Sequence, residues 1–462
     1  MKKVFLKSFV CTFLPMMFAF MLLAGCAKKG GSSGTVNVQM WTAPNQGQYN
    51  YWDAIITEFN AGGITVDGKT VQVAAQMMPE MPSSEAGIQN ALATNSAPAI
   101  SENINRGFAA TLAASGRIYD LQDDSFFKKV AANRSMETIL PGWQIGGKQY
   151  VIPLYANPMG YHYNSKALRE LGFQDVPRTT ADVKKLVTQF RALRDTKMKA
   201  IGVTHTFLRP QLLHPENWWD RWFDFEMQSN AFSQGKPLVD AGVLTMDETA
   251  AKNVLELFGL FGDTLQIAED FTAFEQDIVP DVFQITAPWD IPKYEAAGKA
   301  YGIDGDYVYG PPIVQKESDI PYSFGDAKGL VFYKGGNVSE EQHKGAVAFV
   351  EWVYSASRNS KSDFDWFTTT GMLPMRGDIS SNEAFVQYIA QRPAYQGLAD
   401  LMKYAMPSMA DEHATEILTA LGEAGTAPYI TEAIKNKTLT PTDATAYVVK
   451  MTAAMKAAGS LR

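Results

Sequence analysis

The stretch GKQYVIPLYANPMGYHYNSKALRELGFQDVPRTTADVKKL (147–186) decides the fold class. Its apolar runs predict two buried strands, at 150–154 and 159–163. Thr179 and Asp182 then form a capping box. The helix that they begin carries an apolar face made of Val183, Leu186, Val187 and Phe190. Two strands followed by a capped amphipathic helix indicate an α/β protein.

The same alternation of strands and helices extends on both sides of this stretch. Towards the N-terminus, strands are predicted at 36–41, 71–75 and 97–104, and helices at 52–59, 88–95 and 108–115. Towards the C-terminus, strands are predicted at 283–287 and 329–333, and helices at 254–261, 346–353 and 447–455. Ser339 and Gln342 form a second capping box. Alternation at this spacing indicates a parallel or mixed sheet with helices on both faces.

Length and composition indicate a large folded protein. The chain has 462 residues, of which 46% are hydrophobic and 19% charged, so two or three units of roughly 100–200 residues fit its length. The formal net charge of −8 argues against a nucleic-acid binder, which needs a basic face. Two cysteines and five histidines are too few for a disulfide framework or a Cys/His zinc site. We expect neither a metal nor a cofactor.

The N-terminus has the order of a secretory signal. A basic start with three lysines precedes an apolar run at 9–24, and Leu-Ala-Gly then stands directly before Cys26. This arrangement resembles the bacterial lipobox, in which the cysteine thiol is diacylated and cleavage makes that cysteine the new N-terminus. An uncleaved membrane anchor is the alternative, but the run is barely long enough to span a bilayer and contains Pro15.

We therefore predict that residues 1–25 are a signal peptide, that Cys26 carries lipid, and that residues 26–34 form a flexible tether. Cleavage removes three lysines and no acid, so the net charge of the mature chain is −11. No other apolar run approaches the length of a membrane span. The expected location is outside the cytoplasmic membrane, with the protein anchored to it by lipid.

Signatures of catalysis are not evident. The chain has no H-E-x-x-H motif, no Walker loop and no G-x-G-x-x-G. Its five histidines are scattered, as structural or exposed histidines usually are. Carboxylates are plentiful, so a glycosidase with two opposed carboxylates stays open as an alternative.

Aromatic residues in polar, turn-rich segments are the positive signal for binding. They stand at predicted strand ends or in the segment HPENWWDRWF (214–223): Trp41, Tyr155, Trp218, Trp219, Trp222, Trp289 and, in SDFDWF, Trp366. The face of a tryptophan packs on the apolar face of a sugar ring, while neighbouring amides, carboxylates and guanidinium groups can bind its hydroxyls. Ordinary core packing is the alternative for each of these residues.

Polar candidates follow predicted strands at their C-terminal ends, where open α/β sheets bind ligands. Asn103, Asn105 and Arg106 leave the third strand in this way, with loop capping as the alternative role. Glu80 follows a predicted strand in the same manner. The full set of candidate ligand-binding residues is Trp41, Asn45, Glu80, Asn103, Asn105, Arg106, Tyr155, Asn157, Trp218, Trp219, Asp220, Trp222, Trp289, Asp290 and Arg376.

Taken in chain order, these segments resemble the extracellular solute-binding proteins of carbohydrate ABC transporters, the family of maltose-binding protein. The resemblance covers nearly the whole mature chain and is strongest at 147–173. It extends to ALATNSAPAI (91–100), GFAATLAASGRIYDLQD (107–123), ITAPWDI (285–291), EQHKGAVAFVEWVYS (341–355) and GMLPMRGD (371–378). Ala99, where the family usually has an aspartate, and Asn164-Ser165-Lys166, in place of Asn-Lys, depart from the family pattern.

The resemblance implies a two-lobed periplasmic-binding-protein fold, type II-like, with discontinuous lobes joined by hinge segments. One lobe would comprise 35–155 and 326–382, and the other 157–323 and 383–462. The first crossing would lie near 154–158, the second near 322–326 and the third near 383–395.

The resemblance also implies a function without catalysis. A sugar or oligosaccharide would be captured in an interlobe cleft, with Trp289 as a stacking residue of the second lobe, and delivered to ABC permease subunits by a monomeric, lipid-anchored protein. Hinge bending would close the lobes around it. Two alternatives stay open, a surface glycoside hydrolase and a binding protein for a non-sugar solute. Acidic clusters in the pocket would favour a solute such as a polyamine or peptide.

Overall fold

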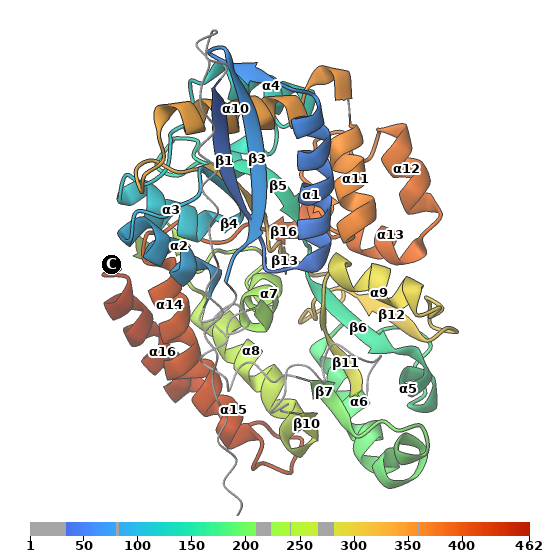
Figure 1. The fold of residues 1–462 in the computed structure, drawn as a ribbon. Coiled ribbons are helices and arrows are strands. Elements are labelled where there is room, and N and C mark those ends of the chain that lie inside the picture. The colour runs from blue at the N-terminus through green and yellow to red at the C-terminus, as the bar shows by residue number, and fades with distance from the viewer. Residues whose placement is uncertain (1–33, 80–82, 209–222, 241, 267–280, 359) are drawn as a thin grey trace, which may run out of the picture.

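A computed structural model describes residues 34–79, 83–208, 223–240, 242–266, 281–358 and 360–462. Its strands form two main sheets, each with helices packed around it, so the chain has the predicted two-lobed α/β architecture. Figure 1 shows the first sheet in the upper part of the molecule and the second in the lower part, with the C-terminal helices running along the second lobe.

The first lobe is built on a mixed sheet with the strand order β15-β5-β14-β4-β1-β3-β2. β1 lies between β3 and β4 and is parallel to both, whereas β14 is antiparallel to its neighbours β4 and β5. The strands are β1 (Thr35–Thr42), β2 (Thr65–Val66), β3 (Lys69–Met77), β4 (Ile100–Asn105), β5 (Ile152–Ala156), β14 (Lys328–Phe332) and β15 (Leu373–Pro374). The sheet thus joins segments that are far apart in the sequence.

The second lobe is built on a smaller sheet with the order β10-β7-β11-β6-β12. β7 runs parallel to β10 and β11, and β6 is antiparallel to β11 and β12. Its strands are β6 (Gly160–Asn164), β7 (His205–Leu208), β10 (Leu265–Gln266), β11 (Asp281–Thr286) and β12 (Tyr307–Gly310). A short hairpin, β8 (Val239–Asp240) and β9 (Val243–Leu244), lies outside this sheet.

Several helices begin at a side chain that accepts a hydrogen bond from their first turn. Both predicted capping boxes are present, Thr179 with Asp182 and Ser339 with Gln342. In the first lobe the helices are α1 (Gln46–Ala61), α2 (Ser84–Ala93), α3 (Arg106–Ala114), α4 (Ser125–Asn133), α10 (Glu340–Val353) and α11 (Lys361–Thr370). Those of the second sheet are α5 (Ser165–Glu170), α6 (Thr180–Leu193), α7 (Phe223–Phe232), α8 (Glu248–Phe261) and α9 (Ile291–Ala296). The C-terminal helices are α12 (Glu383–Ala390), α13 (Pro393–Ala399), α14 (Ala414–Leu421), α15 (Ala427–Ala433) and α16 (Thr445–Ala458).

Each lobe has its own apolar core. The core of the second lobe includes Phe258 and Phe283 together with Ile417, Tyr429 and Met451, so α14–α16 belong to this lobe. α12 and α13 instead share a cluster with α9, α11 and β15, at the boundary of the two lobes. Among the described residues, no helix is long and apolar enough to cross a membrane.

The chain passes between the lobes in three neighbouring segments. The amide of Asn157, just after β5, donates to the Gly325 carbonyl (2.8 Å), and the Gly325 amide donates to the Met406 carbonyl (2.8 Å). β13 (Ser323–Phe324) also pairs in parallel with β16 (Ala405–Met406). Asn157 lies within 154–158 and β13 within 322–326, the segments that we expect to form the first two crossings. The third hydrogen-bonded segment, β16, lies later in the chain than the expected 383–395, because α12 and α13 intervene.

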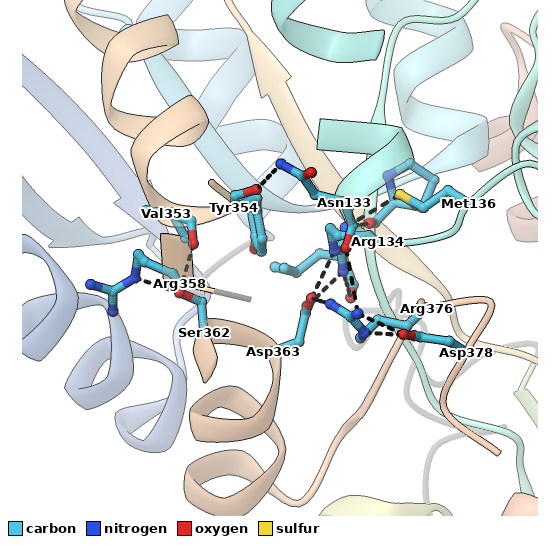
Figure 2. A network of polar contacts seen from close by, with 12 residues as sticks. Asn133, Arg134, Met136, Val353, Tyr354, Arg358, Ser362, Asp363, Arg376 and Asp378 are labelled. Atoms are coloured by element: carbon cyan, nitrogen blue, oxygen red, sulfur yellow. Dashed lines mark hydrogen bonds and ion pairs between the residues drawn. The ribbon is translucent and has the colours of Figure 1, made fainter. Parts of the chain in front are cut away.

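A buried ion-pair network ties the first lobe together. The Arg134 guanidinium donates to both Asp363 oxygens (3.0 and 2.8 Å) and to the Leu154 carbonyl (3.0 Å). Arg376 donates to the same carboxylate at 2.8 Å and pairs with Asp378. Figure 2 shows these side chains converging from α4, α11 and the segment after β15. Asp363 is thus the shared anion of two cations that are themselves buried.

Asp363→Ala should therefore destabilise the protein strongly. The change leaves two buried guanidinium groups without their shared partner, which typically costs about 3–5 kcal/mol. The measurement is the free energy of unfolding from a denaturant titration. The control is Glu351→Ala, which removes an exposed partner of Lys129 and should cost about 0–1 kcal/mol. Similar losses in the two variants would contradict a special role for the buried network.

Candidate functional site

A buried polar network lies at the carboxyl ends of β1 and β4. The Glu102 carboxylate accepts hydrogen bonds from the Ala43 amide (2.8 Å) and from Gln48 Nε2 (3.0 Å). Gln48 also donates to the Tyr155 hydroxyl (3.3 Å), which in turn donates to Asn103 Oδ1 (3.0 Å). The network joins β4, β5 and the start of α1, at the end of the sheet where α/β folds bind ligands.

Burial sets the electrostatics of this network. Glu102 is fully buried, and burial raises its pKa to about 7. Tyr155 is also buried and its ring stacks on Trp366 with centroids 5.1 Å apart. Trp366 itself is fully buried in the core of the first lobe, so the core alternative is correct for this tryptophan.

Two asparagines, Asn103 and Asn105, lie at the end of β4. Asn103 is half-buried and has φ 66°, a left-handed conformation that asparagine tolerates better than most residues. Asn105 caps α3 by accepting from the Phe108 amide (2.7 Å) and donates to Glu85 (3.0 Å). It therefore has the capping role that was its alternative, together with a contact to a buried acid.

Arg106 stands at the edge of this group. Its Nη2 donates to the Gln144 carbonyl (2.8 Å), while its Nε is buried without a hydrogen-bond partner among the described residues. Burial lowers its pKa, and the charge of Asp240, on the β8–β9 hairpin, opposes that shift. Arg106 thus faces a carboxylate that lies outside the first sheet.

The second lobe contributes Trp289 and Asp290. They lie directly after β11, in a short 3-10 helix (Pro288–Asp290). Trp289 is half-buried and packs against the apolar cores of both lobes. Asp290 accepts from the Thr286 hydroxyl (2.6 Å). Trp289 is therefore a side chain of the second lobe that touches the first.

The crossings contribute Asn157 and Asp326. Asn157 is buried and its Nδ2 donates to Asp326 Oδ2 at 3.4 Å. Asp326 also pairs with Lys328 at 3.4 Å. Glu226 of α7 is also buried, and burial, together with the charge of Asp326, raises its pKa to about 8.

The two lobes are in contact beside the site. Thr415 of α14 donates to Glu85 of α2 (3.0 Å), and the Thr111 hydroxyl of α3 donates to the Glu412 carbonyl (2.6 Å). A Cβ on Gly107 would lie 2.7 Å from the Ala414 Cβ, so α3 approaches α14 closely only with glycine there. Burial raises the pKa of Glu85 to about 7.

Several candidates do not join this group. Trp41 is nearly buried in an apolar cluster, and the exposed Asn45 caps α1 by accepting from the Gln48 amide (3.1 Å). Arg376 is buried in the ion-pair network with Asp363, and this placement gives it a structural role. Cys26, Glu80, Trp218, Trp219, Asp220 and Trp222 lie outside the described residues.

Histidine and metal chemistry find no support at this site. His162 lies fully buried between Gln284 and the Tyr294 hydroxyl, and burial lowers its pKa to about 3, as for a neutral structural histidine. Within the described ranges, no group of three or more His, Cys, Asp or Glu side chains could hold a metal ion.

Sequence reasoning missed the buried acids Glu85, Glu102, Glu226 and Asp326. For Glu102 a signal was present, because Ile100, Glu102 and Ile104 alternate in a predicted strand and so point to the same face. Both isoleucines are fully buried or nearly so. An acid between them is expected to be buried as well.

Glu226 should make stability depend on pH. Its folded pKa of about 8 lies above the ordinary 4.5, so between these values the folded state holds a proton that the unfolded state has lost. The contribution of this one carboxyl group to the free energy of unfolding is therefore greatest at low pH. It falls by about 1.4 kcal/mol per pH unit as the pH rises towards 8. We expect Glu226→Gln to lose less stability than the unchanged protein between pH 6 and 8, by about 2 kcal/mol. Unfolding titrations at both pH values measure this difference, and equal slopes would contradict it.

Comparisons with known proteins identify the family to which this architecture belongs. No curated protein matches the chain. The structure is similar to that of an uncharacterised protein from Listeria monocytogenes EGD-e, at 27% identity and a TM-score of 0.70, over 92% of this chain and 98% of that one. It is also similar to the GacH receptor of Streptomyces glaucescens (16%, TM-score 0.67, 92% and 99%). The maltose/maltodextrin-binding domain MalE from Bdellovibrio bacteriovorus is a further neighbour (16%, 0.63, 91% and 99%). The family model of bacterial extracellular solute-binding proteins matches residues 54–397, and the chain belongs to this family.

Proposed function

We propose that the protein captures a sugar or sugar derivative between its lobes and delivers it to an ABC permease. The observation that carries this proposal is the position of Trp289, a half-buried aromatic side chain of the second lobe in contact with the cores of both. The solved neighbours support it, since the GacH structures include complexes with acarbose and the Bdellovibrio domain is bound to maltotriose.

The proposed contacts divide into an aromatic and a polar part. Trp289 supplies a ring face for stacking, which is worth about 0.5–1.5 kcal/mol beyond area burial for aromatic pairs. Asp290, Asn103, Arg106 and Asn157 supply hydrogen-bonding groups from the second lobe, from the end of β4 and from the first crossing. Contacts from two lobes to one ligand would favour the closed arrangement over an open one.

We also propose that the protein acts without catalysis, outside the cytoplasmic membrane. The two acids nearest the end of β4 are engaged, since Glu102 accepts from Ala43 and Gln48, and Glu85 accepts from Asn105 and Thr415. The Leu-Ala-Gly-Cys26 sequence supports export and lipidation at Cys26.

Thermal unfolding of the purified mature protein with a panel of sugars tests the main proposal. A ligand that binds only the folded state raises the midpoint, by an amount that grows with its concentration over Kd. Monosaccharides, maltodextrins, cellodextrins, chitooligosaccharides, polyamines and short peptides form the panel. Stabilisation by polyamines or peptides alone would replace sugar capture with the non-sugar alternative. Sustained release of reducing sugar would support the hydrolase instead.

Trp289→Ala should weaken binding of the best sugar of this panel by about 1–3 kcal/mol, the scale of losing one large apolar contact. Trp289→Phe should recover much of the loss, because a ring face remains. Calorimetric titration of the three proteins measures the effect. Equal affinities would show that Trp289 is only a core residue.

Cys26→Ala should release the protein from the membrane and leave the sugar affinity unchanged. The residue stands in the expected tether, ahead of β1, which begins at Thr35. Membrane fractionation and calorimetry measure the two properties separately. A weaker affinity in the variant would mean that the tether takes part in the site.

A further inference from the structure

Buried carboxyl groups outnumber cations where the lobes meet. Glu85 comes from α2, Glu102 from β4, Asp326 from the second crossing and Glu226 from α7, and all four are buried. Among the described residues, Arg106 lies at the edge of this region, and a second cation is Lys328. It pairs with Asp326 (3.4 Å), and its charge partly opposes the rise in pKa that burial causes at Glu85 and Glu102.

Two buried side chains near the crossings have an acceptor oxygen without a hydrogen-bond partner among the described residues. Glu226 Oε2 and Asn157 Oδ1 are buried and have no hydrogen-bond partner in the part of the chain that the structure describes. Glu226 is 5% exposed and Asn157 is 1% exposed. A buried acceptor without a partner costs about 1–3 kcal/mol, so two together indicate a place for a donor.

The two side chains lie on segments that meet at the second crossing. The Asn157 amide that carries the free oxygen donates its nitrogen to Asp326 Oδ2 (3.4 Å). α7 carries Glu226 and also Asn230, whose Nδ2 donates to the Ser323 carbonyl (3.3 Å). Ser323 lies in the second crossing, three residues before Asp326. Figure 1 shows α7 directly below β13, between the two lobes.

We propose that the captured sugar carries a basic amine, and that Glu226, Asp326 and Asn157 bind its ammonium group. The inference rests on the proposed function and names the chemical class of the ligand. An ammonium group has three donors and no acceptor, which matches a group of acceptors with a surplus of negative charge.

A neutral hydroxyl matches this group less well. It donates a single hydrogen bond, so it satisfies only one of the acceptors of Glu226, Asp326 and Asn157. Burial holds the pKa of Glu226 at about 8, so without a cation this carboxyl is protonated at neutral pH. An ammonium in contact favours the ionised form, and the charged pair then gains a charge-assisted hydrogen bond.

Matched sugars that differ at one position provide the test. The probes are glucose, N-acetylglucosamine and glucosamine, and the β-1,4 trisaccharides cellotriose, triacetylchitotriose and the glucosamine trimer, with maltotriose and spermidine added. Kd is measured by calorimetry at pH 7. We expect the amine member of a series to bind at least about tenfold more tightly than its neutral members.

Variants identify the residues responsible. Glu226→Gln removes the carboxylate while keeping the shape, and Asp326→Asn places a residue that tolerates the φ of 26° found there. Each should weaken binding of the amine probe by about tenfold or more and leave the neutral probes within about twofold. The control Glu256→Gln removes an acid of the same lobe that pairs with Lys252 and should change neither. Cooperative unfolding, with circular dichroism spectra like that of the unchanged protein, shows that the free variants are folded.

Each outcome supports or contradicts either the ammonium site or sugar capture. Neutral sugars that bind as tightly as the amine probes, or Glu226→Gln and Asp326→Asn proteins that bind amines normally, overturn the inference and leave sugar capture intact. Binding of spermidine with no sugar bound overturns sugar capture while supporting the ammonium site.

Discussion

The structure depends on the narrow seam where three segments of chain cross between the lobes. Gly325 stands at its centre, accepting from the Asn157 amide and donating to the Met406 carbonyl. A Cβ at Gly325 would lie 3.1 Å from that carbonyl oxygen and 3.3 Å from the Ala405 Cβ, so the segments lie too close for a larger side chain without adjustment. Because the chain leaves the first lobe and returns to it, the first sheet is assembled from distant segments, whereas the strands of the second sheet all lie between the first two crossings. The carboxyl ends of β4 and β5 come next to the second lobe.

The same seam explains why so many carboxyl groups are buried. Charged groups brought between two lobes lose solvent from both sides, and burial without compensation costs several kcal/mol per ion. The protein reduces this cost in two ways. Glu102 and Glu85 receive neutral donors from Gln48 and Asn105, whereas Asp326 receives the cation Lys328. Within the described part of the chain, Glu226 Oε2 has no hydrogen-bond partner, which distinguishes Glu226 from the other three.

The sequence predicts local structure well because its signals are local. Strand alternation and the capping boxes at Thr179 and Ser339 are encoded within a few residues, and the structure has both. The resemblance to a binding family supplied the two-lobed arrangement, which periodicity alone does not show. Arg376 is a candidate ligand-binding residue in the segment GMLPMRGD, where the sequence does not indicate its partner. Its partnership with Asp363, and that of Arg134 with an aspartate 229 residues away, depend on the tertiary fold. The buried acids escaped notice for the same reason, except at Glu102, where the flanking isoleucines indicate the buried face.

Affinity and selectivity have separate origins in this arrangement. A ring face such as that of Trp289 stacks on many sugars, because the apolar face of a pyranose is common to them, so stacking contributes binding energy with little discrimination. Buried polar groups discriminate, since a ligand that fails to match them leaves them unpaired at the full desolvation cost. The groups that could discriminate here lie at the crossings, where Asn157 and Asp326 are part of the segments that connect the lobes. A ligand group bound at that place would contact the segments that connect the two lobes.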